Sequence, residues 1–225
     1  AENIAPYWIE IFKNTSNSRI ETDLIEYLGK SGMFTIPIAE KLLAPMSDVR
    51  QKAALALKKS WDDRILPVIL RLSKSSNPID RIYLLEALNH LYDIRFQKLV
   101  ISLLSDDNKS VRIYAIKCVM DNDIKEASTA IKRLVADDKN DEVRKRGIDA
   151  LVHFKDTGSG AIIAGLLKEG NRDLSLAAIK ALRSLKYGNS AGPLSEMLLR
   201  ENDREIREAV IDALIGFGKA GNIDG

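Results

Sequence analysis

The 225-residue sequence has little of what several protein classes require. Aromatic residues make up only 6% and there are six prolines, whereas β-domains use more aromatic and turn-forming residues, so the composition favours helices. A single cysteine, Cys118, excludes a disulfide framework and a cysteine-based zinc site. No apolar run reaches the roughly eighteen residues of a membrane span. No basic and apolar leader marks a signal peptide, although a cleaved one would leave no trace.

Net charge is also small. The chain carries 34 lysines and arginines against 32 aspartates and glutamates, a net charge of +2, which argues against a dedicated polyanion binder. The charge is uneven, because residues 41–120 hold fourteen basic and eight acidic groups. A basic middle favours an acidic partner.

What the sequence does contain is an internal repeat built on an apolar residue followed by arginine. Clear copies read DVRQKAALAL (48–57), SVRIYAIKCV (110–119), EVRKRGIDAL (142–151) and EIREAVIDAL (205–214), and weaker ones read IDRIYLLEAL (79–88) and DLSLAAIKAL (173–182). The anchor positions, spaced by 31 or 32 residues, are Arg50, Arg81, Arg112, Arg144, Ser175 and Arg207. Six copies so nearly in phase indicate a repeat architecture.

Each anchor is expected in the first turn of a helix. Four residues before the anchors stand Met46, Asn77, Asn108, Asn140, Asn171 and Asp203. Five of these six are Asn or Asp, which are preferred helix N-caps. A shorter apolar stretch precedes each copy, at 36–44, 65–73, 96–105, 127–135, 161–170 and 193–200. The pattern therefore predicts helix–turn–helix units, each with a first and a second helix, which must stack to bury their apolar faces.

The two ends fit the pattern less well. Residues 1–35 are expected to form a degenerate first unit, with helices over 7–14 and 20–32. Residues 36–216 form the regular units of a single repeat domain covering 1–225. Residues 217–225 read either as a tail or as the turn into a further repeat.

The helical period assigns roles to positions in the second helices. Positions −1, +3, +6, +7 and +10 from the anchor should face the core, and the apolar position +4 should contact the neighbouring unit. The arginines fall on the same flank. We expect a structural ladder in which Arg50, Arg81, Arg112, Arg144 and Arg207 bind carboxylates or helix ends between units. Candidate partners are Asp48, Glu142 and Glu205, or the acidic residues of adjacent turns.

With its Asn/Asp cap, its apolar-arginine pair and the Ala-Leu that follows six to seven residues later, the chain resembles the HEAT-repeat family, in its short-repeat subtype named after phycobilisome lyases. The resemblance covers residues 36–216 well and 1–35 loosely. It implies an all-α fold, a right-handed α-solenoid of about seven stacked units. It also implies that the second helices line a concave, partner-binding face.

A candidate binding patch lies on the second helices of the two middle units. Positions +1 and +2 are normally polar in this family, but here they hold Ile-Tyr in two successive units. A cluster of exposed apolar and tyrosine side chains is typical of a contact site, although packing between units would explain it as well. The predicted partner-binding residues are Ile82, Tyr83, Glu86, Ile113, Tyr114 and Lys117.

Catalytic and metal-binding patterns are missing. His90 and His153 occupy equivalent positions two units apart, about 20 Å, and cannot share a metal ion. Cys118 replaces an alanine of other repeats and reads as a small core residue. GKSG at 29–32 lacks the rest of a phosphate loop. We expect no catalytic residue, no metal and no cofactor.

The sequence therefore predicts a cytoplasmic, non-enzymatic scaffold or adaptor that binds a helix or extended peptide of a protein partner, without inserting into a membrane. Three alternatives stay open: a chromophore-lyase-like or chaperone subunit, a nucleic-acid-binding protein like the HEAT-type DNA glycosylases, and a regulatory domain of a larger protein. The near-zero net charge disfavours nucleic acid.

Overall fold

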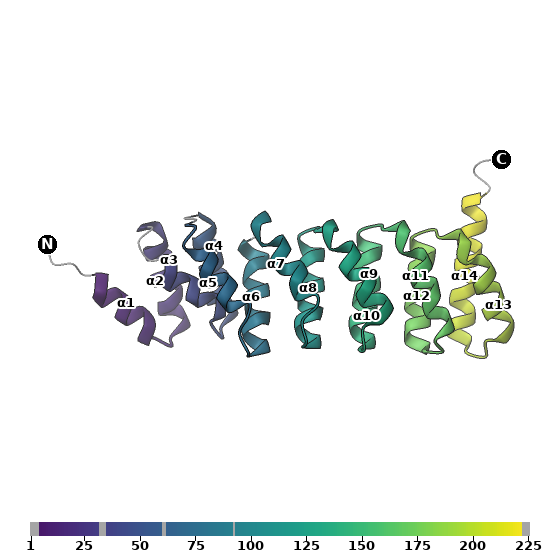
Figure 1. The fold of residues 1–225 in the computed structure, drawn as a ribbon, viewed down its shortest axis with the longest axis horizontal. Coiled ribbons are helices and arrows are strands. Elements are labelled where there is room, and N and C mark those ends of the chain that lie inside the picture. Colours follow the sequence, from purple (N-terminus) through teal and green to yellow (C-terminus); the bar gives the residue numbers. More distant parts are fainter. Residues whose placement is uncertain (1–4, 32–34, 60–61, 92, 222–225) are drawn as a thin grey trace. The chain divides into compact units, whose positions relative to one another are not determined.

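The computed structural model describes residues 5–31, 35–59, 62–91 and 93–221, and all of its regular elements over these ranges are helices (Figure 1). The chain divides into two compact units, Ala1–Asn122 and Asp123–Gly225. Each unit is built from consecutive helix pairs. The fold is an α-solenoid, as the repeat predicts.

The described residues of the first unit form four helix pairs. Its first helices are α1 (Ala5–Asn14), α3 (Thr35–Glu40), α5 (Ile65–Leu72) and α7 (Gln97–Leu103), and its second helices are α2 (Ser18–Ser31), α4 (Ser47–Lys59), α6 (Pro78–Leu91) and α8 (Lys109–Asp121). The 3₁₀ turns η1 (Lys41–Leu43) and η2 (Ile94–Phe96) lie beside α3 and α7. The four second helices stand side by side, each packed on the next (Figure 1).

The second unit contains three pairs of the same design. Its first helices are α9 (Ser128–Asp137), α11 (Gly160–Gly165) and α13 (Ala191–Arg200), and its second helices are α10 (Asp141–His153), α12 (Arg172–Ser184) and α14 (Arg204–Gly221). The 3₁₀ turns are η3 (Lys125–Ala127), η4 (Thr157–Ser159), η5 (Leu166–Lys168) and η6 (Gly188–Ser190). Here α10 packs on α12 and α12 packs on α14.

The predicted caps start the second helices. The Asn108 side chain accepts from the Ser110 and Val111 amides, and Asn171 accepts from Asp173 and Leu174. Asn77, Asn140 and Asp203 each accept one such amide bond. Met46 has no acceptor to offer, and in its repeat Asp48 accepts from the Val49 amide instead. Cap chemistry thus fixes the phase of α6, α8, α10, α12 and α14.

Position +4 is covered by the neighbouring helices, as expected. Ala54, Leu85, Ile116, Ile148 and Ile179 are at most 1% exposed. In α14 the same position, Ile211, is 44% exposed.

The last helix runs further than the sequence indicates. Residues 216–221 continue α14 and do not form a turn, whereas 222–225 lie outside the described residues. The physical reason is packing, because Leu214 and Phe217 lie against a buried cluster centred on Leu194 and Val210. This apolar contact holds the helix together in spite of Gly216 and Gly218.

Candidate functional site

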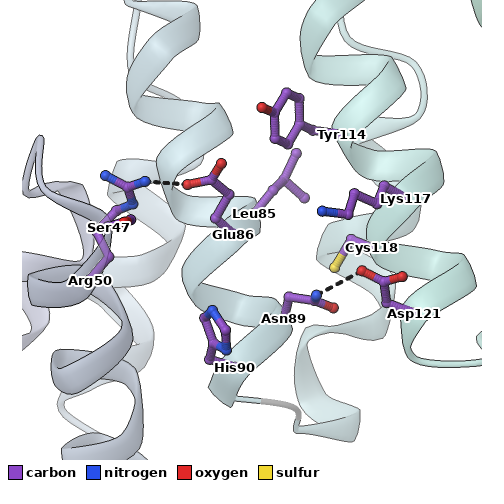
Figure 2. A pocket seen from close by; sticks show the side chains of 10 residues that line it. All are labelled: Ser47, Arg50, Leu85, Glu86, Asn89, His90, Tyr114, Lys117, Cys118 and Asp121. Atoms are coloured by element: carbon purple, nitrogen blue, oxygen red, sulfur yellow. Dashed lines mark hydrogen bonds and ion pairs between the residues drawn. The ribbon is translucent and has the colours of Figure 1, made fainter.

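A groove crosses three successive second helices of the first unit, and we call it the α6–α8 groove (Figure 2). Its volume is about 260 Å³. Its lining residues are Ser47 and Arg50 of α4, Leu85, Glu86, Asn89 and His90 of α6, and Tyr114, Lys117, Cys118 and Asp121 of α8. Positions +5, +8 and +9 of the repeat supply half of this lining, so the groove follows the repeat register.

Arg50 closes the α4 side of the groove. Its Nη1 donates to the carbonyl oxygens of Ala44 (2.7 Å) and Pro45 (2.8 Å), and its Nη2 pairs with the Glu86 carboxylate. The guanidinium also lies 4.0 Å from the centre of the Tyr83 ring, a cation–π contact. Arg50 and Glu86 are therefore fixed in place, and their charges largely neutralise each other.

A hydrogen-bonded chain of amides closes the other end. Asn89 Nδ2 donates to the Asp121 carboxylate at 2.9 Å. Asn122 Nδ2 donates to the Asn89 side-chain oxygen and, at 2.8 Å, to the Cys118 carbonyl. This chain joins α6 to the end of α8, which keeps the two walls of the groove at a fixed separation.

Cys118 contributes no reactive thiol. Burial, together with the negative charge of Asp121, raises the pKa of the Cys118 thiol to about 12, against the smaller opposing effects of Asn122 and Lys117. The thiol stays protonated at neutral pH, and the thiolate is the nucleophilic form. Cys118 is a packing residue of the groove wall.

Lys117 and Tyr114 are the groups that the groove leaves for a ligand. Lys117 is exposed and has no acidic partner among the described residues. Figure 2 shows its ammonium pointing from α8 across the groove toward Leu85 and Glu86 of α6. Tyr114 is half-buried beside it, and His90 is exposed on the α6 side. An ammonium, a phenol and an imidazole thus face one shallow, polar opening.

The structure brings together three of the six predicted partner-binding residues. Glu86, Tyr114 and Lys117 line the groove. Ile82 and Ile113 are half-buried and are not among its lining residues, and Tyr83 lies against Arg50.

Four further lining residues were not among the predicted binding residues. Ser47, Asn89, His90 and Asp121 were not predicted, although the last three occupy repeat positions +8 and +9. Position +9 holds a different residue type in most repeats, including Lys59 and Ser184, so the sequence carried no signal for His90 and Asp121.

The ladder arginines bind the ends of the first helices. Each anchor arginine donates to carbonyl oxygens of its own pair, in the last turn of the first helix for Arg144 and in the linker just after the first helix for the other four. The acceptors are Ala44 and Pro45 for Arg50, Ser75 for Arg81, Asp106 and Asp107 for Arg112, Val135 and Ala136 for Arg144, and Glu201 and Asn202 for Arg207. A cation there satisfies carbonyls near the C-terminal end of the first helix, where a positive charge is also favoured.

Three anchors also bind a carboxylate of the next pair. Besides Arg50 and Glu86, Arg81 makes two bonds to Asp106, at 2.8 and 2.7 Å, and Arg144 makes two to Glu169, at 2.7 and 2.6 Å. The Arg144 guanidinium holds the pKa of Glu169 below its usual range.

The carboxylates predicted as partners lie elsewhere. Asp48 accepts from the Val49 amide, Glu142 pairs with Lys145 and Arg146, and Glu205 pairs with Arg172. Arg172 takes over where Ser175 replaces the anchor arginine, binding Asp203 at 2.8 Å and Glu205 at 2.6 Å. The ladder thus links neighbouring pairs through carboxylates such as Asp106 and Glu169, which are acidic residues of adjacent turns.

Two further kinds of site are absent from the described part of the chain. No group of three or more His, Cys, Asp or Glu side chains lies close enough together there to hold a metal ion. None of the helices in the same ranges has the length and apolar character needed to cross a membrane.

Two kinds of comparison place the chain among known proteins. Crystal structures of two engineered proteins share its fold, with TM-scores of 0.53 in both cases. The first is 15% identical, and the match covers 95% of this chain and 97% of that one. The second is 16% identical, with 94% and 67% covered. No curated protein matches.

A family model described as HEAT repeats matches residues 65–152 and 131–215, about two thirds of the sequence. The chain belongs to the HEAT-repeat family.

Proposed function

We propose that the chain is a non-enzymatic interaction scaffold whose α6–α8 groove holds a helix or extended peptide of a protein partner. The observation that carries this proposal is the contrast within the groove. Arg50 with Glu86 and Asn89 with Asp121 are already paired, whereas Lys117, Tyr114 and His90 face the opening. The paired groups hold the walls and the others are available to a ligand.

The size of the groove favours a peptide. Small-molecule sites commonly enclose about 300–1,000 Å³ and are mainly apolar. The α6–α8 groove, at about 260 Å³, is smaller and lined largely by polar groups. A groove of this kind accepts one or two side chains of a longer segment that continues over the neighbouring second helices. Preorganised walls lower the entropy lost on binding.

The chemistry of the groove supports binding over catalysis. Cys118 carries a protonated thiol, and Glu86 is held by Arg50. Among the described residues, no hydrogen bond joins His90 to the hydroxyl of Ser47 or to this thiol. A general base without a nucleophile or an oriented partner supplies no recognisable reaction. The lyase-like subtype and the cytoplasmic location stay predictions.

Peptide selection tests the proposal. A random peptide-display library is selected on the full chain, and binders are counter-screened on a Lys117→Glu variant and a Tyr114→Ala/Lys117→Glu variant. We expect selected peptides to lose about a hundredfold in affinity for the double variant, because central aromatic and charged contacts dominate interface energies. Isothermal titration calorimetry gives the affinities.

Lys109→Glu is the matched control. Lys109 lies on the same helix, is exposed, and undergoes the same change of charge outside the groove. It should leave affinity within about twofold, because a distant exposed charge contributes little. Peptides that bind all variants equally, or that lose affinity equally with Lys109→Glu, would refute the α6–α8 groove as the binding site. Circular dichroism checks that each variant stays helical.

A further inference from the structure

A second groove lies between α2 and α4, and we call it the lysine groove. Its volume is about 410 Å³. Its lining residues are Glu26, Gly29, Lys30, Lys52, Leu55, Ala56 and Lys59. None of these residues belongs to the α6–α8 groove, so the two surfaces can be tested independently.

The floor of the lysine groove has almost no side chains. A Cβ atom placed on Gly29 would lie 3.0 Å from the Cβ of Ala56, so α2 and α4 approach each other closely there. Next to this floor, the Leu55 side chain is 41% exposed. A shallow opening bounded by glycine, alanine and an exposed leucine offers an apolar seat for one side chain of a ligand.

The rim is positively charged, and two of its lysines already pair with the carboxylate of Glu26. Glu26 lies 3.2 Å from the Lys52 ammonium and 3.6 Å from that of Lys30. The hydrogen bond from Lys52, and then the charges of Lys52 and Lys30, lower the pKa of Glu26. Lys59 is exposed and has no acidic partner among the described residues. Three lysines against one glutamate leave the lining with a net charge of +2.

Helix ends alone do not account for this surface. Lysines are favoured near helix C-termini, which explains why Lys30 and Lys59 stand in the last turns of α2 and α4. That preference explains neither the position of Lys52, one turn into α4, nor the exposed Leu55 beside the bare floor. The lysine groove combines a small apolar surface with an excess of ammonium groups. It therefore favours a ligand that carries both an apolar group and negative charges.

We infer that the lysine groove binds an acidic peptide segment that carries one apolar side chain among its carboxylates. The apolar side chain would lie on Gly29 and Ala56 against Leu55. Flanking carboxylates would approach Lys52 and Lys59, as Glu26 already approaches Lys52. The low net charge of the chain and the apolar seat favour such a peptide over a nucleic acid.

A labelled model peptide tests the inference. The probe is a fluorescein-labelled peptide of about twelve residues, rich in Glu with one central Leu, and fluorescence anisotropy reports its binding to the full chain. We expect saturable binding that Lys52→Glu/Lys59→Glu weakens by about tenfold or more, since like charges then face each other. Replacing every Glu of the peptide by Gln, or its Leu by Ser, should weaken binding to a similar degree.

Two control variants separate binding in the lysine groove from a general effect of charge and from binding in the α6–α8 groove. Lys74→Glu/Lys98→Glu imposes the same change of net charge at exposed positions outside the lysine groove and should leave binding nearly unchanged. Tyr114→Ala/Lys117→Glu should also bind normally, because it alters only the α6–α8 groove. Circular dichroism confirms that each variant is folded.

Three outcomes would overturn the inference. The first is failure of the unmodified chain to bind the peptide. The second is an equal loss of binding in Lys74→Glu/Lys98→Glu, which would show an effect of net charge only. The third is tighter binding of a short DNA duplex, or of phosphatidylserine vesicles, than of the peptide, which would make the surface a general polyanion site.

Discussion

Asp106 holds two helix pairs together through one side chain and one carbonyl. Its carboxylate accepts two bonds from Arg81 of α6 and one, at 2.9 Å, from the Asn108 amide that begins α8. Its carbonyl oxygen accepts from Arg112 at 2.8 Å. Both Arg81 and Asp106 side chains are less than 10% exposed. The same sequence pattern that placed the anchors could not single out this acceptor, because Asp107 stands next to it.

The neighbouring aspartates give a sharp test of this contact. Asp106→Ala should lower the free energy of unfolding by about 3 kcal/mol, because it leaves the buried Arg81 guanidinium without its main partner. Asp107 also lies 2.9 Å from Arg81, but its side chain is 92% exposed, so Asp107→Ala should cost about 0.5 kcal/mol or less. Urea unfolding followed by circular dichroism gives both values. Equal losses would contradict the assigned role of Asp106.

Acid should weaken the ladder. Although burial opposes it, bonds from Arg81 and the Asn108 amide give a net lowering of the pKa of Asp106, and Arg144 lowers that of Glu169. A carboxyl group with a lowered folded-state pKa stabilises the fold above its unfolded-state pKa. This stability is lost as pH falls through the folded-state pKa. Unfolding free energies measured from neutral pH down to about pH 3 should fall more steeply for the parent than for Asp106→Asn.

At the scale of the element, small residues set how closely first and second helices pack. A Cβ on Gly147 of α10 would lie 2.7 Å from Val135 Cγ2 of α9. A Cβ on Gly160, at the start of α11, would overlap the Tyr187 ring, whereas one on Gly165 of the same helix would meet nothing within 4 Å. No local feature of the sequence showed that Tyr187, which follows α12, covers Gly160 of α11.

The two glycines of α11 should therefore respond in opposite directions. Gly160→Ala is expected to lower the free energy of unfolding by about 2 kcal/mol, because the new methyl group displaces the Tyr187 ring. Gly165→Ala should raise it by up to about 1 kcal/mol through helix propensity. Thermal unfolding by calorimetry compares the pair. Destabilisation of similar size in both variants would show that the Tyr187 contact is not the cause.

The ends of the second helices repeat one strained feature. Asp123, Lys155 and Lys186 have φ angles of 49°, 53° and 52°, and they recur at the repeat spacing, just after α8, α10 and α12. Glycine adopts this left-handed conformation without the steric cost of a Cβ atom.

Lys155→Gly and Lys186→Gly should each raise the free energy of unfolding by about 1 kcal/mol, because glycine removes the steric cost of a Cβ atom at one left-handed residue. Lys168→Gly, at an exposed site in η5, is the comparison and should not stabilise. A stabilisation of all three variants would point to a charge effect, since each removes one lysine. Urea unfolding midpoints decide between these results.

For the whole molecule, the repeat register was the strongest signal in the sequence. The periodic Asn/Asp caps and anchors predicted the second helices of the regular units, because cap chemistry and apolar period are local properties. The grooves were harder to foresee, because they depend on side chains from helices about thirty residues apart. Glu86, Tyr114 and Lys117 were among the predicted partner-binding residues, but Asn89, His90 and Asp121 were not. Likewise, no local rule predicts the division after Asn122 or the length of α14.

The most direct test of the central claim is amide chemical-shift mapping by NMR of the full chain, titrated with a peptide selected on it. We expect the largest shifts to fall on groove residues of α6 and α8, around Asn89, Tyr114 and Lys117, and to disappear in the Tyr114→Ala/Lys117→Glu variant. Shifts concentrated on the first helices α5 and α7, with the groove amides unchanged, would contradict the claim.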